Sequence, residues 1–323
     1  MKKEMSFSSN VKEELSRVPC RRTHCQIAEF AALFAFCGQL RVTSSNGMHM
    51  AIQSENLPVI RKCFTLLRKS FNISGGVAIR TIGARTKLYT VCVLNTDDVL
   101  RIMQALKILG PDRRISVHGE LVNPLIIQSD CCKRAFIRGA FLSAGSMSDP
   151  HKSYHLEIVC PSLLKAAQLQ SIMKNFALSA KTVQRKNNYV VYLKDGDQIV
   201  DILNIMEAHK ALLELENIRI LHDIANQVNR QTNCEVANSQ KTITASARQQ
   251  EDILLIQRTI GFGQLSDGLA QLASLRLEYP DLPLKELGER LSPPIGKSGV
   301  NHRLRKLNQI ANKIRETKQG ELL

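Results

Sequence analysis

The N-terminal two-thirds of the chain carry the same succession of hydrophobic periods twice. Between residues 26 and 210, apolar positions recur at helical spacing, then at alternate positions, then at helical spacing again. The first copy predicts helices over 26–38 and 57–71 and a last helix ending near 108, with strands over 39–43, 48–53, 76–82 and 87–94. The second copy predicts helices over 131–145, over 162–178 and from about 197, with strands over 154–160, 181–186 and 189–194. Gly38 and Gly145, 107 residues apart, end the leading helices, so an α/β half of about a hundred residues is duplicated.

The two leading helices each keep small residues on one face. These residues recur at spacings of three or four, and they are Ala28, Ala32 and Ala35 in the first helix and Ala135, Gly139 and Ser143 in the second. A glycine inside a helix costs about 1 kcal/mol relative to alanine, which Gly139 offsets if the two helices are in close contact. The alternative is a pair of ordinary core helices that happen to be rich in alanine.

The C-terminal part has a different pattern. Residues 227–250 are polar with little apolar periodicity, and they predict a linker or a loosely packed lead-in. Four helices follow over 251–260, 266–278, 284–291 and 298–315. A short third helix, a tight break over 292–296 and a longer basic helix form a helix-turn-helix pattern. We therefore divide the chain into domains at 1–212 and 251–323, joined by 213–250.

The last of these helices has one apolar side and one polar side. At about 100° per residue, the apolar positions coincide at Val300, Leu304, Leu307, Ala311 and Ile314, which predicts that this side is buried.

The polar side of the same helix suits a nucleic acid. Asn301, His302 and Arg305 lie in its first turns, where side chains of a recognition helix meet base edges. Phosphate contacts are expected from Lys297 and Ser298 at the helix start and from Lys306. Arg303 falls toward the apolar edge, where it reaches the DNA backbone or makes an internal pair. The alternative for the whole stripe is a solvated basic face.

The charge balance favours a polyanionic partner. The chain has 44 Lys and Arg against 29 Asp and Glu, a net charge of +15 on 323 residues. Basic residues exceed acidic ones by eight over 61–118 and by six over 297–318, so there are two basic centres. In the N-terminal domain we expect phosphate contacts from strand and turn residues, namely Arg41, Arg80, Arg85, Lys87 and Arg185.

Composition also excludes several classes of protein. No uncharged apolar stretch approaches the roughly 18 to 20 residues that span a bilayer, and the first fifteen residues lack the apolar core of a secretory signal. Nine cysteines in a large chain indicate reduced thiols in the cytoplasm. Glycine-rich phosphate loops and nucleophile elbows are absent, so no cofactor is expected.

A metal site is considered and set aside on spacing. Cys20, His24 and Cys25 suggest a zinc site, and Cys131 and Cys132 suggest a redox pair. No second ligand pair stands at a finger-like spacing, and adjacent cysteines do not readily form a relaxed disulfide. We therefore expect no metal.

The repeat resembles the LAGLIDADG homing-endonuclease fold. The segments that carry the resemblance are FAALFAFCG at 30–38 and IRGAFLSAG at 137–145. The resemblance implies that the paired helices form the interface between halves and that the strands form a saddle over DNA. Active members have an acid before the final glycine of each helix, where this chain has Cys37 and Ala144. Neither a thiol nor a methyl group holds Mg²⁺ in an all-oxygen shell, which favours a binder without nuclease chemistry.

The whole chain resembles the WhiA family of bacterial transcription regulators. The most specific segment is GKSGVNHRLRKL at 296–307, and SFSSNVKEEL at 6–15 and NCEVAN at 233–238 also match. The resemblance implies an α+β protein with a degenerate two-repeat LAGLIDADG-like domain and a small all-α helix-turn-helix domain. It also implies a double-stranded DNA-binding regulator at the nucleoid, linked to sporulation in actinomycetes and to cell division and chromosome organisation in other Gram-positive bacteria.

Two other functions stay open at this point. One is a metal-dependent endonuclease that uses non-standard acids such as Asp130 or Asp149, and the other is an RNA-binding protein. The sequence leaves undetermined the operator, the sign of regulation, any ligand in the N-terminal cleft, the oligomeric state and any protein co-regulator.

Overall fold

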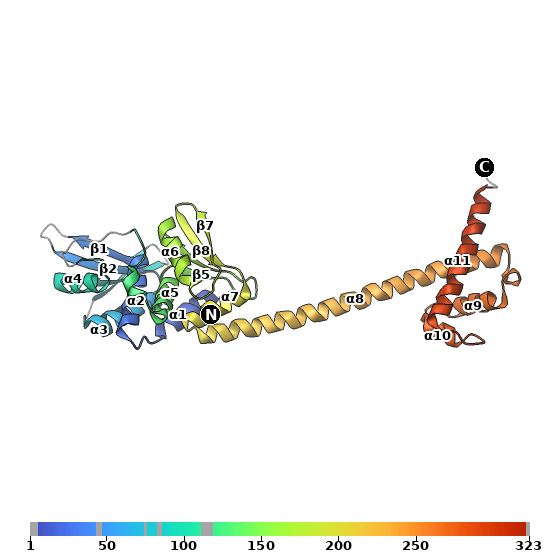
Figure 1. Cartoon of the computed structure of the whole chain (residues 1–323), viewed down its shortest axis with the longest axis horizontal. Helices are drawn as coiled ribbons and strands as arrows, with labels where there is room; N and C mark the ends of the chain where they lie inside the picture. The colour runs from blue at the N-terminus through green and yellow to red at the C-terminus, as the bar shows by residue number, and fades with distance from the viewer. Residues whose placement is uncertain (1–5, 43–46, 74–75, 83–85, 111–118, 321–323) are drawn as a thin grey trace. The chain divides into compact units, whose positions relative to one another are not determined.

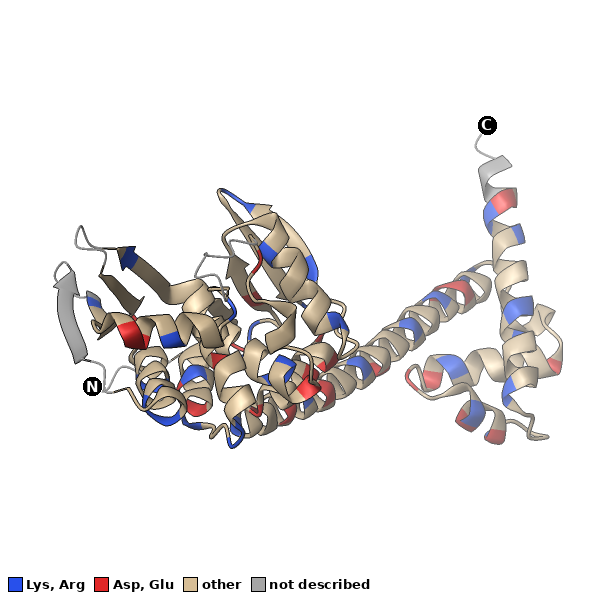
Figure 2. Ribbon diagram, turned by 60° about the vertical axis from the view of Figure 1, so that its left-hand side comes forward, with Lys and Arg blue, Asp and Glu red and all other residues tan. Residues whose placement is uncertain are grey.

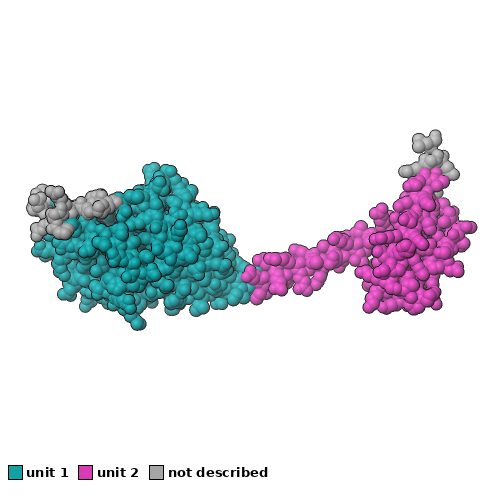
Figure 3. All heavy atoms as spheres, in the orientation of Figure 1, with its two compact units in different colours: residues 1–222 teal, residues 223–323 magenta. Residues whose placement is uncertain are grey.

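The structure is a computed structural model that describes residues 6–42, 47–73, 76–82, 86–110 and 119–320. Side chains are described for all of these except 76–82, 86 and 318–320. The chain forms two compact units, residues 1–222 and residues 223–323, which are coloured separately in Figure 3. Each unit has its own hydrophobic core.

The first unit contains the predicted repeat (Figure 1). After helix α1 (Phe7–Arg17), the first copy consists of α2 (Thr23–Cys37), β1 (Gly38–Val42), β2 (Met48–Ser54), α3 (Leu57–Phe71), β3 (Gly76–Ile82), β4 (Thr86–Val93) and α4 (Thr96–Ala105). A short 3-10 helix η1 (Pro124–Ile126) precedes the second copy, which consists of α5 (Asp130–Ala144), β5 (Gly145–Met147), β6 (Leu156–Cys160), α6 (Leu163–Lys174), β7 (Lys181–Arg185), β8 (Asn188–Leu193) and α7 (Gly196–Met206). The α+β fold with two equivalent halves is confirmed.

Each half forms a four-stranded antiparallel sheet with the same topology. The strand orders are β1-β2-β4-β3 and β5-β6-β8-β7. Alternate residues are buried, such as Met50 and Ile52 in β2 and Leu156 and Ile158 in β6, so each sheet buries one face. The sequence missed β5, because three residues are too few to show an alternation.

The helices α2 and α5 pack closely at their small residues. A Cβ atom on Gly139 would lie 2.6 Å from the carbonyl oxygen of Glu29 and 2.9 Å from the Cβ of Ala32. Ala28, Ala32 and Ala135 are buried in the same interface. The expected close contact is therefore confirmed, and it explains why a glycine stands inside a helix.

Helix α8 (His209–Thr259) corrects the expected linker. It is continuous over 51 residues and includes both the polar segment 227–250 and the separate helix expected over 251–260. Residues 209–259 contain no glycine or proline, so nothing in them ends a helix. A solvated helix needs no apolar stripe, and for this reason hydrophobic periodicity gave no signal.

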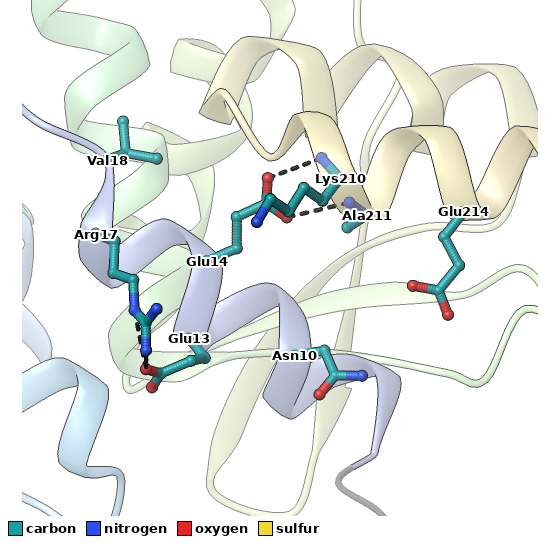
Figure 4. A pocket seen from close by; sticks show the side chains of 8 residues that line it. All are labelled: Asn10, Glu13, Glu14, Arg17, Val18, Lys210, Ala211 and Glu214. Atoms are coloured by element: carbon teal, nitrogen blue, oxygen red, sulfur yellow. Dashed lines mark hydrogen bonds and ion pairs between the residues drawn. The ribbon is translucent and has the colours of Figure 1, made fainter.

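The start of α8 is held by α1. The Glu14 carboxylate accepts hydrogen bonds from the backbone N–H groups of Lys210 (2.8 Å) and Ala211 (3.1 Å), beside a cavity of about 450 Å³ (Figure 4). An acid in this place caps the helix and complements its dipole. Leu215 and Ile218 are buried, so the first unit extends beyond the expected boundary at residue 212.

The second unit is a small helical domain. It contains the end of α8, a short 3-10 helix η2 (Phe262–Gln264), α9 (Asp267–Glu278), α10 (Leu284–Glu289) and α11 (Lys297–Gly320). A Cβ on Gly288 would overlap the carbonyl oxygen of Ile295, which shows how tightly the turn after α10 folds back. The four helices predicted from the sequence are present, with the first fused into α8. In the described part of the chain, no helix is long and apolar enough to cross a membrane.

Candidate nucleic-acid interface

Helix α11 presents a polar face that starts at its first residue. Val300, Leu304, Leu307 and Ala311 are buried in the core of the second unit, and Ile314 is half-buried at its edge. The opposite side chains are exposed, and they are Lys297, Ser298, Asn301, His302, Arg305 and Lys306. The structure thus places six of the seven expected residues at the surface of one helix.

These six side chains are available to a ligand. None of them makes a side-chain hydrogen bond or an ion pair within residues 6–42, 47–73, 76–82, 86–110 and 119–320. Figure 2 shows basic positions along α11 in blue. Asparagine and arginine side chains offer bidentate hydrogen bonds to base edges, and the start of a helix favours an anion.

Arg303 is different from its neighbours. Its Nη1 donates a hydrogen bond to the carbonyl oxygen of Gly268 at 3.1 Å, and the residue is half-buried. Two roles were expected for Arg303, a contact with the DNA backbone or an internal pair. The structure shows an internal contact, whose partner is a backbone carbonyl. Arg303 joins α11 to α9, so we remove it from the expected phosphate contacts.

A second anchor fixes α11 against α8. The buried carboxylate of Asp252 accepts hydrogen bonds from Arg315 (2.6 Å) and from Asn308 (2.6 Å). A carboxylate that is both paired and hydrogen-bonded offsets its burial cost. The sequence gave no sign of these contacts, because Asn308 and Arg315 follow Asp252 by 56 and 63 residues.

The first sheet carries part of the expected basic surface. Arg41 is exposed, lies opposite His49 in the register, and donates to Gln39 at 3.3 Å. Lys87 is exposed at the start of β4. It has the same alternation phase as the buried Val91, so it lies on the opposite face of the sheet from Arg41. The backbone of Arg80 pairs with Leu88 in the register, and Arg85 lies outside the described residues.

In the second sheet, the charge of Arg185 is offset. Its Nη1 lies 3.0 Å from Oε2 of Glu157, and Nε2 of His155 lies 3.1 Å from the same oxygen. The other oxygen, Oε1, accepts a hydrogen bond from the Ser146 hydroxyl at 3.1 Å. Burial raises the pKa of Glu157, but the hydrogen bonds from His155 and Ser146 and the charge of Arg185 outweigh it, so the pKa is lowered. Arg185 therefore contributes less positive potential than its exposure suggests.

The sequence missed Glu157, although its pattern contained a signal. Glu157 is the polar position between the buried Leu156 and Ile158 of β6, and Arg185 stands on the edge strand β7 of the same sheet. The alternation thus marked Glu157 as a polar position, but the register aligns Lys181 and not Arg185 with it across β8, so the strand order alone does not predict this ion pair.

The positions that hold catalytic acids in active endonucleases have a different chemistry here. Cys37 ends α2 beside the side chains of Ser143 and Lys12. Burial lowers the pKa of Lys12, and the neighbouring Cys37 opposes that shift. A thiol, a methyl group at Ala144 and a neighbouring ammonium group offer no oxygen ligands to Mg²⁺.

The acids considered as substitutes are engaged elsewhere. Asp130 lies in the first turn of α5, at the opposite end of that helix from Ala144, and pairs with Lys133 at 3.1 Å. Asp149 accepts a hydrogen bond from the backbone N–H of His151 at 3.0 Å. In the part of the chain that the structure describes, no set of three carboxylates converges.

Glu29, the remaining acid of α2, is fully buried. It lies 3.2 Å from Nζ of Lys62 and 2.9 Å from Nε of Arg138, and it accepts a hydrogen bond from the Cys20 thiol at 2.8 Å. Burial, reinforced by the charge of Glu29, raises the pKa of Cys20 to about 12. This acid holds the two halves together and has no access to a phosphate.

Comparisons with known proteins identify the family. Residues 23–109 match the WhiA N-terminal LAGLIDADG-like domain, 133–225 the WhiA LAGLIDADG-like domain and 228–311 the WhiA C-terminal HTH domain. The chain is 50% identical to the probable cell division protein WhiA of Lachnoclostridium phytofermentans over 97% of this chain and 100% of that protein. The chain belongs to the WhiA family.

Other WhiA proteins agree over the same length. The probable cell division protein WhiA of Alkaliphilus metalliredigens is 46% identical over 96% of this chain and 99% of its own. A crystal structure of full-length DUF199/WhiA from Thermatoga maritima is 25% identical, with a TM-score of 0.59 over 96% of this chain and 99% of that chain. The two α/β halves are thus the LAGLIDADG-like domains of WhiA, and α9 to α11 lie in its helix-turn-helix domain.

Proposed function

We propose that this WhiA-family protein is a sequence-specific regulator of transcription that binds double-stranded DNA through α11. The observation that carries the proposal is the polar face of α11, where six exposed side chains lack a partner in the described chain while their helix is fixed by a buried apolar side. A helix held in this way can enter the major groove without losing its own packing.

Different residues of this face have different roles in the proposal. Asn301, His302 and Arg305 read base edges, because their side chains carry directional donors and acceptors. Lys297 and Lys306 contact phosphates, and Ser298 donates to a phosphate at the helix start.

The N-terminal domain supplies charge and support in this proposal, and the protein is not an enzyme. Arg41, Arg80 and Arg85 contribute phosphate contacts in this proposal, whereas Lys87 lies on the other face of the sheet from Arg41 and does not. Arg185 contributes only when it leaves Glu157. The Cys37 and Ala144 positions, with Lys12 beside Cys37, support the absence of nuclease chemistry.

The biological role follows from the relatives. Several are named probable cell division proteins, so we propose that the regulated genes serve cell division. The same proposal places the protein in the cytoplasm at the nucleoid. A link to sporulation belongs to actinomycete members of the family and is a further hypothesis here.

The proposal is tested by selection from a random duplex pool with the full-length protein, followed by footprinting on the enriched site. We expect one enriched motif that is protected over one face of the helix. An Asn301→Ala, Arg305→Ala double variant serves as a control, and it should bind the pool without enriching the motif.

Two results contradict the proposal. Equal enrichment by the wild type and the double variant places sequence readout outside α11. Preferential binding of a matched RNA hairpin, or Mg²⁺-dependent nicking of plasmid that persists through purification, supports one of the two other functions.

A further inference from the structure

Two residue pairs that are far apart in the sequence meet in the first unit. His24 and Cys25 lie in the first turn of α2, and Cys131 and Cys132 lie in the first turn of α5. Because these helices pack side by side, their first turns bring the two pairs together. The metal-ligating atoms of the four residues all lie within 4.8 Å of one another.

The distances among these atoms suit a tetrahedral ion. His24 Nδ1 lies 3.0 Å from Cys132 Sγ and 3.5 Å from Cys25 Sγ. Zn–S bonds of about 2.3 Å and Zn–N bonds of about 2.0–2.1 Å separate neighbouring ligand atoms in a tetrahedron by about 3.6–3.8 Å. Adjustments of a few tenths of an ångström to about 1 Å convert the observed cluster into that geometry.

We propose that His24, Cys25, Cys131 and Cys132 bind one structural zinc ion that joins the two LAGLIDADG-like halves. Three sulfur ligands and one imidazole nitrogen are a donor set typical of zinc. All four tetrahedral positions are filled by the protein, so the ion has no open position for substrate or water. The site is structural and lies at the opposite end of α2 and α5 from Cys37 and Ala144.

The surroundings favour both the charge and the entry of the ion. Three thiolates and one Zn²⁺ carry a net charge of −1, and the N-terminal ends of α2 and α5 provide positive partial charges beside it. His24 is exposed, and it lines a cavity of about 290 Å³ together with Cys132. The cavity provides a path for the ion from solvent.

Competing interpretations account less well for the cluster. Cys131 and Cys132 are adjacent, so they do not readily form a relaxed disulfide with each other. A disulfide between Cys25 and one of them would leave the remaining thiol and the His24 nitrogen without a role. Cys20, which sequence spacing had grouped with His24 and Cys25, is not part of the cluster, because its thiol donates to Glu29.

The sequence concealed this site because its ligands come from two repeats. The second pair follows the first by 106 residues, from Cys25 to Cys131, and no zinc motif has that spacing. The two pairs meet only if the N-terminal ends of α2 and α5 lie next to each other, and the sequence does not show this. In the structure these two ends do lie together. We therefore abandon the expectation that the chain holds no metal.

The proposal is tested on the full-length protein, purified under reducing conditions without a polyhistidine tag. Elemental analysis should find about one zinc ion per chain and no iron. After zinc is removed with a chelator, Co²⁺ should produce a thiolate-to-metal charge-transfer band and the visible bands of tetrahedral cobalt. Zinc-loaded protein should unfold at a higher temperature than the zinc-free protein.

Variants separate zinc binding from general folding. Cys131→Ser with Cys132→Ser should abolish zinc binding, whereas His24→Cys should retain it because a Cys₄ set is also a zinc site. Cys234→Ser, which changes the exposed thiol of α8, should leave the zinc content unchanged.

Three results would overturn the proposal. They are wild-type protein that takes up neither zinc nor cobalt, zinc content that is unaffected by the double serine variant, and a disulfide from Cys25 to Cys131 or Cys132 in protein isolated under reducing conditions. The cobalt spectrum of the wild type keeps the test decisive if the double variant fails to fold.

Discussion

The guanidinium of Arg138 and the carboxylate of Glu29 form a buried ion pair across the two halves, with Nε 2.9 Å from Oε1. Glu29 is on α2 and Arg138 is on α5, and their side chains are 0% and 3% exposed. Lys62 of α3 approaches the same carboxylate at 3.2 Å. The Glu29 carboxylate thus faces two buried cations, and the more exposed Glu207 also pairs with Arg138 at 3.4 Å.

Replacing this acid should destabilise the first unit strongly. Glu29→Gln leaves Lys62 buried without a counter-charge and leaves Arg138 with only the more exposed Glu207, 3.4 Å away, and breaking a buried pair typically costs about 3–5 kcal/mol. Denaturant unfolding of wild type and variant measures the difference. Glu216→Gln, which removes a more exposed partner of Arg219, is the matched control and should cost under about 1 kcal/mol. Equal losses for the two variants would mean that the buried network contributes no more than a surface pair.

The close contact of α2 and α5 gives a second prediction. An alanine at Gly139 gains about 1 kcal/mol in helix propensity but places its Cβ 2.6 Å from the Glu29 carbonyl oxygen. Because overpacking costs about 1–3 kcal/mol, Gly139→Ala should lower the free energy of unfolding. Gly196→Ala is the control, since the nearest atom to its added Cβ is 3.5 Å away, and it should be neutral or stabilising. A stabilised Gly139→Ala variant would show that the helices can separate without loss.

The sequence predicted those features that depend on local periodicity. The two repeats, the small-residue helix faces and the buried side of α11 all follow from spacing within one element. Features that depend on partners distant in the sequence were missed, such as the pairing of Glu157 with Arg185 and the meeting of Cys25 with Cys132. Their ligands or charges become neighbours only after the strands are ordered and the two helices are packed.

Helix α8 was missed for a different reason. Its central part lies in solvent, so no apolar face marks it, and only the absence of glycine and proline over 209–259 distinguishes it from a linker. Arg303 likewise stands among exposed basic residues in the sequence, and its contact with Gly268 required the packing of α9 on α11.

Glu157 should make stability depend on pH. Its pKa is lowered in the folded protein, so its stabilising contribution is present above the unfolded pKa of about 4.3 and is lost as the pH falls through the folded value. Glu157→Gln should therefore lower the melting temperature at pH 7, and the difference from wild type should shrink as the pH falls below the unfolded pKa of about 4.3 and through the lowered folded value. Thermal unfolding from pH 3 to pH 7 measures this. A difference that stays constant across the range would assign the effect to hydrogen bonding alone.

The face of α11 should separate readout from charge. Arg305→Ala should cost about 1 to 3 kcal/mol on a cognate duplex and much less on random DNA, because it removes a base contact. Lys306→Ala should weaken both alike and reduce the salt dependence by about one unit of slope. Fluorescence anisotropy at several salt concentrations distinguishes the two. Arg303→Ala should instead lower the stability of the second unit, since its side chain bonds Gly268.

The two units should divide affinity and specificity between them. Because Leu215 and Ile218 are buried, a stable N-terminal fragment must end near residue 222, and the complementary fragment covers 223–323. The fragment 1–222 should bind duplex DNA weakly, with little sequence preference and a steep loss of affinity as salt rises. The fragment 223–323 should keep the preference of the whole protein but bind less tightly, since linkage raises the effective concentration of the second contact. Titration of both fragments onto cognate and scrambled duplexes at two salt concentrations tests the division. Strong discrimination by 1–222 would place sequence readout in the strands of the saddle and reduce α11 to an anchor.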